Sequence, residues 1–337
     1  MIQFQLSFVI KEVSSKKYKI FFKKLVLGGG IGIIEMMYKS NIFGLVGGGK
    51  NPKYTPNKVI LWDDYQTKIL NEFKLTSSVK NLKLKKDKIV IVCEQRIYIY
   101  STDKYKLLET IETFKNEIGT IGINTDQNFT VIGYPTFPEG FIKVKFYEKS
   151  QELDIHAYDS MISCISVNSD GTLVAASSNK GTAISIFCVS NGTFIEEFRR
   201  GKEKAIISCI SFDEYSSWMG VCSERGHVHI FSMGNVWETI KKNGEERTKI
   251  PPNEEELPKN DSSFLKVLPN FLTGGAFDGD KSFAKVNVEA QNAICAIFPN
   301  YDIVVITSTG KYYQAKLNPK KGGNCQIVKT EDLSVKK

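Results

Sequence analysis

Two adjacent arginines, Arg199 and Arg200, offer the most specific chemistry in the sequence. They follow the apolar, strand-like run 193–198 and precede Gly201, where the chain can turn away. A guanidinium presents a planar fork of donors that suits phosphate, so an arginine pair can hold anionic groups. Because successive side chains of a strand point to opposite faces, we expect the two arginines to reach separate pockets, one phosphate in each. Two solvated surface arginines are the alternative.

The composition is that of a globular protein with a basic surplus. The 337 residues are 42% hydrophobic and 24% charged, and 45 Lys and Arg against 37 Asp and Glu give a net charge of +8. This charge favours an anionic partner: a membrane surface, a phospholipid headgroup or a nucleic acid. Charges interrupt every apolar run before the roughly 18 residues that a transmembrane helix needs, and the N-terminus lacks the pattern of a secretory signal. Seven scattered cysteines without a Cys-x-x-Cys motif predict reduced intracellular thiols.

Short apolar runs separated by turn residues predict an all-β protein. The run Ile-Ser-Cys-Ile-Ser at 162–166 recurs at 207–211, a spacing of 45 residues, which is typical of WD-type β-propeller blades. At that period the chain holds about seven units. The strand runs place blades at residues 28–75, 78–113, 118–158, 160–200, 205–288 and 293–332, and residues 1–27 would be all that is left of a further, first blade. The sequence therefore predicts a seven-bladed β-propeller that forms a single domain over residues 1–337.

The predicted sixth blade contains a long loop, residues 232–281. Its first half is rich in charge and proline, which predicts disorder. Its second half carries apolar residues bracketed by polar ones, and an exposed segment of this kind can enter a membrane interface. The residues expected to insert are Phe264, Leu265, Val267, Leu268, Phe271 and Leu272. The alternative, that this segment folds back on the propeller as a minor core, remains open.

Other candidate chemistries lack essential parts. The glycine clusters at 28–32 and 47–49 have neither dinucleotide-binding nor P-loop spacing, so blade turns explain them better. His227 and His229 could share a strand face, but no third metal ligand is placed by spacing. No nucleophile-elbow motif marks a catalytic triad. The lysine run 80–88 lacks stacking aromatics for nucleic acid. We therefore expect no enzyme activity, metal, cofactor or nucleic-acid partner.

Several motifs occur together in an order that is typical of one family. The arginine pair follows a WD-type repeat and precedes a long loop by one blade, and further matches lie at 28–35, 45–52, 56–63, 266–272 and 319–325. On these residues the chain resembles the PROPPIN family, from about residue 25 to the C-terminus. The resemblance implies a seven-bladed propeller that binds polyphosphoinositides and acts in autophagy and endosomal traffic.

The resemblance also implies two shallow headgroup sites for phosphatidylinositol 3-phosphate and phosphatidylinositol 3,5-bisphosphate. The earlier-blade site would use Ser178, Thr182 and Arg199, and the later-blade site would use Arg200, Ser223, His229 and His227. His227 stands where the family usually has threonine. In the earlier site, Tyr158 replaces a family histidine and Ser185 replaces a basic residue, so we expect the later site to be the sounder of the two.

The function expected from the resemblance is that of a non-enzymatic lipid effector. It would attach to membranes carrying phosphatidylinositol 3-phosphate and recruit autophagy or organelle-biogenesis factors there. The process it would serve is protein transport. We expect a monomer in solution that is cytoplasmic and peripheral on phagophore, endosomal or vacuolar membranes, with the membrane of a plastid-like organelle as the alternative. The alternative function is a WD-repeat protein-interaction scaffold whose lipid sites are degenerate.

Overall fold

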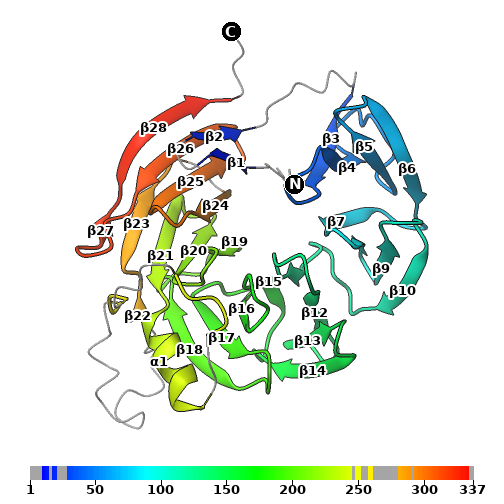
Figure 1. Cartoon of the computed structure of the whole chain (residues 1–337). Helices are drawn as coiled ribbons and strands as arrows, with labels where there is room; N and C mark the ends of the chain where they lie inside the picture. The colour runs from blue at the N-terminus through cyan, green and yellow to red at the C-terminus, as the bar shows by residue number, and fades with distance from the viewer. Residues whose placement is uncertain are drawn as a thin grey trace. The chain divides into compact units, whose positions relative to one another are not determined.

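The computed structural model describes residues 10–14, 17–20, 29–244, 247–251, 257–260, 280–289 and 292–333. The chain divides into two compact units, residues 1–120 and 121–337. The described residues form β-sheets and a single helix (Figure 1). No helix in this part of the chain is long and apolar enough to cross a membrane.

The first unit contains two four-stranded antiparallel sheets, here called blades 1 and 2. Blade 1 consists of β3 (Ile31–Met36), β4 (Ile42–Gly47), β5 (Lys58–Asp63) and β6 (Lys68–Lys74). Blade 2 consists of β7 (Val79–Leu84), β8 (Lys88–Cys93), β9 (Arg96–Ser101) and β10 (Leu107–Glu112). A separate two-stranded sheet pairs β1 (Ile10–Ser14) with β2 (Lys17–Ile20).

The second unit contains blades 3 to 6. Blade 3 is β11 (Gly122–Ile123), β12 (Val131–Thr136), β13 (Phe141–Phe146) and β14 (Gln151–His156). Blade 4 is β15 (Ile162–Val167), β16 (Leu173–Ser178), β17 (Ala183–Cys188), β18 (Phe194–Arg199) and β22 (Asp280–Lys281). Blade 5 is β19 (Ile207–Phe212), β20 (Trp218–Ser223), β21 (His227–Ser232), β23 (Ala284–Asn287) and β27 (Gly323–Asn324). Blade 6 is β24 (Ala293–Ile297), β25 (Asp302–Thr307), β26 (Lys311–Lys316) and β28 (Gln326–Asp332).

The prediction of seven blades is wrong, because the described residues form six. The six blade segments read from the strand runs each correspond to one sheet. The repeat period and residues 1–27 predict the seventh blade, and the described residues of that segment, 10–14 and 17–20, form the short strands β1 and β2, which pair with each other. The period also overcounts because the insertion after β21 lengthens blade 5 without adding a blade. The described residues thus make up an all-β β-propeller of six blades.

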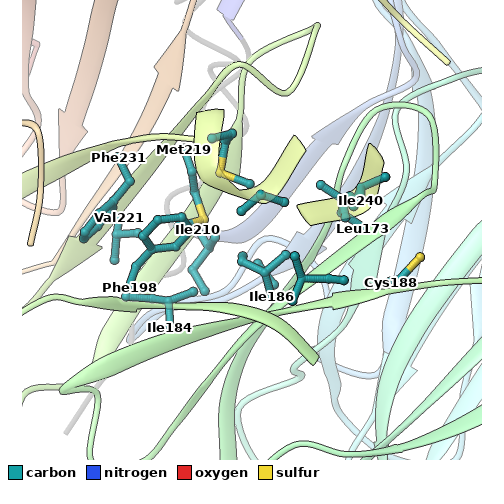
Figure 2. Close-up of a cluster of buried hydrophobic side chains, with 14 of the residues drawn as sticks. Leu173, Ile184, Ile186, Cys188, Phe198, Ile210, Met219, Val221, Phe231 and Ile240 are labelled. Carbon is teal, nitrogen blue, oxygen red and sulfur yellow. The ribbon is translucent and has the colours of Figure 1, made fainter. Parts of the chain in front are cut away.

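Blade 4 is packed on both faces, as the alternation of strand side chains requires. Phe198, Ile184 and Ile186 lie in one buried cluster with Val221 and Phe231 of blade 5 (Figure 2). The rings of Phe198 and Phe231 are 5.0 Å apart. The opposite face belongs to a second cluster, shared with blade 3, which contains Ala176 and Phe187 of blade 4. Each interface carries a dry core that fixes the ends of its strands.

The segment after β21 begins with helix α1 (Gly234–Lys242), which lies beside β18 (Figure 1). Val236 and Ile240 are buried in the core shared by blades 4 and 5, and Trp237 donates its indole N–H to the Ser216 carbonyl at 2.7 Å. Arg247 donates to Ser217 Oγ at 2.7 Å. This described part of the loop is folded, so the expectation of disorder is wrong for it. The residues expected to enter the membrane, 264–272, lie outside the described residues.

Candidate functional site

The arginine pair lies at the outer edge of blade 4, at the end of β18. Arg199 pairs with Ala183 of β17 on one side and, in parallel, with Lys281 of β22 on the other. Glu197 precedes it by two residues and therefore shares its face of the strand, whereas Phe198 points into the core between blades 4 and 5. The pair is thus positioned by a strand whose other residues are fixed by packing.

Arg200 is held in place by backbone carbonyls. Its side chain is only 8% exposed, and its guanidinium donates to the carbonyl of Gly181 (Nε to O, 2.8 Å) and to that of Glu203. Burial, and then the neighbouring charge of Arg225, lower its pKa from the usual arginine value. Because arginine titrates so far above neutral pH, the side chain stays charged. This is a partly desolvated, pre-oriented cation, which suits anion binding.

A cavity of about 600 Å³ opens beside the pair. Its wall comes from β18 and β22 of blade 4 and from β23 and β27 of blade 5. The wall carries six cationic residues, namely Arg199, Arg200, Lys202, Lys281, Lys285 and Lys321, and no Asp or Glu among its lining residues. Within the described part of the chain, the three lysines at 281, 285 and 321 form no ion pair with a carboxylate. The cavity is therefore a concentrated positive site.

The blade 5 side of the wall is completed by a turn from far along the chain. β27 pairs in parallel with β23, with Asn324 opposite Lys285. The N–H of Gly323 donates to the Phe283 carbonyl at 2.9 Å, and that of Cys325 donates to the Lys285 carbonyl at 2.8 Å. The backbone of Gly322 has φ +60 and lies so close to Phe283 that a β-carbon at this position would be 2.4 Å from the Phe283 carbonyl oxygen. Glycine is therefore the residue that this docked turn accommodates. This docking brings Lys321 into the wall.

The predicted later-site residues lie on the blade 5 face of the same interface. His229 of β21 pairs with Val221 on one side and with Lys285 on the other, and it is only 6% exposed. Its Nδ1 is 3.1 Å from Ser282 Oγ. Burial lowers the pKa of His229 to about 3, and the charges of Lys285 and Arg200 act in the same direction. His229 is therefore neutral at physiological pH and can offer one ring N–H.

Two further predicted residues flank His229. Ser223 ends β20, is 2% exposed, and accepts the backbone N–H of Arg225 through Oγ at 3.4 Å. His227 begins β21, shares the face of His229, and is exposed. The lining residues of the cavity include Arg200 and Lys285 but not His229, Ser223 or His227. All three stay predictions as headgroup ligands.

Two predicted earlier-site residues, Ser178 and Thr182, lie at the end of β16 and directly before β17 of blade 4. Ser178 ends β16, is 6% exposed, and accepts the N–H of Lys180 at 3.3 Å. Thr182 follows in the turn to β17, and its carbonyl accepts the Arg200 N–H at 2.9 Å. Thr182 is thus beside Arg200, but neither Ser178 nor Thr182 is among the residues that line the cavity. Their role as phosphate ligands stays a prediction.

Arg199 and Arg200 are both lining residues of the cavity, although alternation along β18 puts the Arg199 side chain on the strand face opposite Phe198. Separate phosphate pockets for the two arginines therefore stay a prediction.

Lys281, Lys285 and Lys321 were not identified as site residues. The available signal was their position, because Lys281 ends the long loop, Lys285 follows it and Lys321 is in the closing turn 319–325. These segments meet through long-range pairing.

Fold and site together define a β-propeller with a strongly cationic cavity between two neighbouring blades. Residues 29–334 match the family model PROPPIN, so the chain belongs to the PROPPIN family. It is 32% identical to Autophagy-related protein 18e of Arabidopsis thaliana over 90% of this chain and 76% of that protein. It is 26% identical to Autophagy-related protein 18 of Yarrowia lipolytica over 90% of this chain and 87% of that one. These relatives are named for autophagy rather than for a reaction.

Solved structures agree on the fold. Kluyveromyces lactis Hsv2 matches with a TM-score of 0.67 over 90% of this chain and 87% of that chain, at 19% identity. A second solved structure, described as "Complex of KlAtg21 with coiled-coil of AgAtg16", matches with a TM-score of 0.66, also at 19% identity. At this level of identity the likeness establishes the propeller architecture alone.

Proposed function

We propose that the chain is a non-enzymatic effector that binds phosphoinositide headgroups and so attaches to membranes carrying phosphatidylinositol 3-phosphate or phosphatidylinositol 3,5-bisphosphate. The observation that carries this proposal is the cavity at the end of β18, with its six cationic lining residues and no lining carboxylate. Membership of the PROPPIN family supports it. Attached in this way, the protein recruits autophagy or organelle-biogenesis factors to the membrane surface.

Charge and geometry support a phosphate ligand. A phosphate monoester carries a charge of about −1.5 to −2 at neutral pH and accepts several hydrogen bonds. The pre-oriented guanidinium of Arg200 can supply paired donors, and the lysines of the wall can compensate the remaining charge. The cavity volume of about 600 Å³ is in the range of small-molecule binding sites, so the cavity is large enough for a phosphorylated inositol ring.

A protein-interaction scaffold is the second candidate function. A structurally similar protein is described as a complex with a coiled coil, so the propeller architecture can present a surface to a helical partner. Under this alternative the cationic cavity is incidental, and binding to membranes does not depend on the arginine pair.

Flotation with vesicles separates the two functions. We expect the wild type to float with vesicles containing phosphatidylinositol 3-phosphate and to float far less with vesicles containing unphosphorylated phosphatidylinositol. The double variant Arg199→Thr with Arg200→Thr should float equally poorly with both kinds of vesicle. The control variant, Lys104→Thr with Lys106→Thr, loses the same charge from exposed lysines that do not line the cavity. It should still float preferentially with the vesicles that contain phosphatidylinositol 3-phosphate. Equal flotation of wild type and arginine variant would refute lipid binding at the cavity and favour the scaffold.

The predicted hydrophobic loop is a second membrane contact in this proposal. A headgroup site and an inserting segment that act together bind more tightly than either alone, because the second contact forms at high effective concentration. Phe271→Asp should therefore weaken attachment to vesicles and leave the affinity for a soluble headgroup unchanged. Unchanged attachment would show that this segment does not insert.

A further inference from the structure

Three consecutive residues of the long loop lie across the turns of three neighbouring blades. They are residues 247–249, here called the strap, and they follow helix α1 along the chain. Arg247 donates to the Tyr215 carbonyl and, at 2.7 Å, to Ser217 Oγ, both in the turn between β19 and β20 of blade 5. Its guanidinium also lies over the Trp237 ring, 5.0 Å from the ring centroid. Hydrogen bonds and a cation–π contact therefore hold the first residue of the strap on blade 5.

The next two residues of the strap continue onto blades 4 and 3. Thr248 donates its hydroxyl proton to Asp170 Oδ2, in the turn between β15 and β16 of blade 4. Lys249 donates to Ser169 Oγ of the same turn at 3.0 Å. Its ammonium nitrogen also lies 3.1 Å from Asp126 Oδ2, in the loop between β11 and β12 of blade 3. Successive residues of the strap thus contact blades 5, 4 and 3 in turn.

The turns beneath the strap form one continuous surface. The N–H of Asp126 donates to the Ser169 carbonyl at 3.1 Å, which joins blade 3 to blade 4. The side-chain amide of Asn168 donates to Ser216 Oγ at 3.1 Å, which joins blade 4 to blade 5. Since neither bond involves the strap, this surface is pre-formed. We call it the turn row, and the residues that it offers to the strap are Asp126, Ser169, Asp170, Tyr215 and Ser217.

The turn row and the strap are complementary in charge. The strap presents an arginine and a lysine two residues apart, and the turn row answers with two carboxylates, two hydroxyls and a carbonyl. Such complementarity selects the partner of a surface more than it sets the strength of binding. The ion pair of Lys249 with Asp126 keeps 32% of the lysine side chain exposed, so it contributes little to stability. The strap is therefore a specific occupant of the turn row that another basic segment can displace.

The rest of the loop has anchors of its own on both sides of the strap. On the N-terminal side, Val236 and Ile240 of α1 are buried in the core between blades 4 and 5. On the C-terminal side, Asn260 accepts the Ser232 N–H at 2.8 Å and donates to the Ser232 carbonyl at 2.7 Å. The strap can therefore leave the turn row while these anchors stay in place. Held between them, it competes for the turn row at high effective concentration.

We infer that the turn row of blades 3 to 5 is a docking site for a short basic segment of a partner protein, and that the strap occupies this site in the isolated chain. The strap shows the chemistry that the site takes, namely an arginine and a lysine separated by one residue. The inference goes beyond the proposed function, because it assigns a protein-binding surface that does not depend on lipid binding.

The test measures binding of the strap sequence as a separate peptide. The probe is a fluorescein-labelled peptide with the sequence of residues 246–251, and the protein is the full chain carrying Arg247→Ala, Thr248→Ala and Lys249→Ala. We expect saturable binding to this triple variant in fluorescence anisotropy and binding to the wild type that is weaker by about 10-fold or more, because the tethered strap competes. An absence of saturable binding to the triple variant, or equal binding to both proteins, would overturn the inference.

Further substitutions in the triple variant locate the peptide. Asp126→Asn with Asp170→Asn should abolish its binding, whereas Asp154→Asn with Asp159→Asn removes two exposed carboxylates outside the turn row and should leave the affinity unchanged. If the first pair prevents folding, Asp126→Lys alone should weaken binding, and a peptide with aspartate in place of its lysine should recover it. Full affinity after Asp126→Lys would place the peptide outside the turn row and overturn the inference.

Discussion

The lysines of the cavity wall give the sharpest test of its charge. Lys281, Lys285 and Lys321 are exposed, line the cavity, and are brought together by β22, β23 and the turn that precedes β27. A basic side chain near an anionic membrane contributes about 1 kcal/mol. Replacing all three with glutamine should therefore cost about 3 kcal/mol, which corresponds to a loss of affinity of about 100-fold.

The assay is co-sedimentation with vesicles containing phosphatidylinositol 3-phosphate, at two salt concentrations. The triple variant should bind about 100-fold more weakly than the wild type near physiological salt. Its affinity should also depend less on salt, because fewer charges are screened. The charge-matched control replaces Lys104, Lys106 and Lys149, which are exposed and do not line the cavity. If the control loses as much affinity as the cavity variant, net charge explains binding and the cavity does not.

Two further predictions concern the residues behind the wall. Burial lowers the pKa of His229 to about 3, so between about pH 6.5 and pH 3 the unfolded chain binds a proton that the folded chain excludes. The free energy of unfolding should therefore fall as the pH decreases through this range. In urea unfolding, His229→Gln should make the free energy of unfolding depend less on pH, and an unchanged pH dependence would contradict this prediction. Gly322→Ala places a β-carbon 2.4 Å from the Phe283 oxygen at φ +60, so it should undock the turn and weaken headgroup binding in titration calorimetry. An unchanged affinity would show that the docked turn does not support the site.

Local sequence patterns were sufficient for the longer strands of the six blades. Short apolar runs located each of the six blades, since a four-stranded meander uses consecutive segments of the chain. The alternation of β18 correctly separates the buried Phe198 from the half-buried Arg199. The blade count was wrong because a repeat period divides the whole length, including the insertion after β21, which lengthens blade 5 without adding a blade.

The rest of the candidate site depends on long-range pairing that no local pattern encodes. β22 and β27 are two residues long, too short to be recognised as strands, yet they bring Lys281 and Lys321 to the cavity. Tyr158 and Ser185 each appeared in the sequence as an isolated departure from the family pattern. The structure shows that their side chains contact each other, with Glu197 completing the chain of hydrogen bonds. Helix α1 was missed because its segment is charged and its apolar residues are few.

The central claim is that a phosphorylated inositol ring binds in the cavity between blades 4 and 5. The measurement that tests it most directly is a crystal structure of the full chain soaked with inositol 1,3-bisphosphate. The account predicts a headgroup in this cavity, with a phosphate in hydrogen-bond contact with the Arg200 guanidinium. An empty cavity at saturating ligand would contradict it.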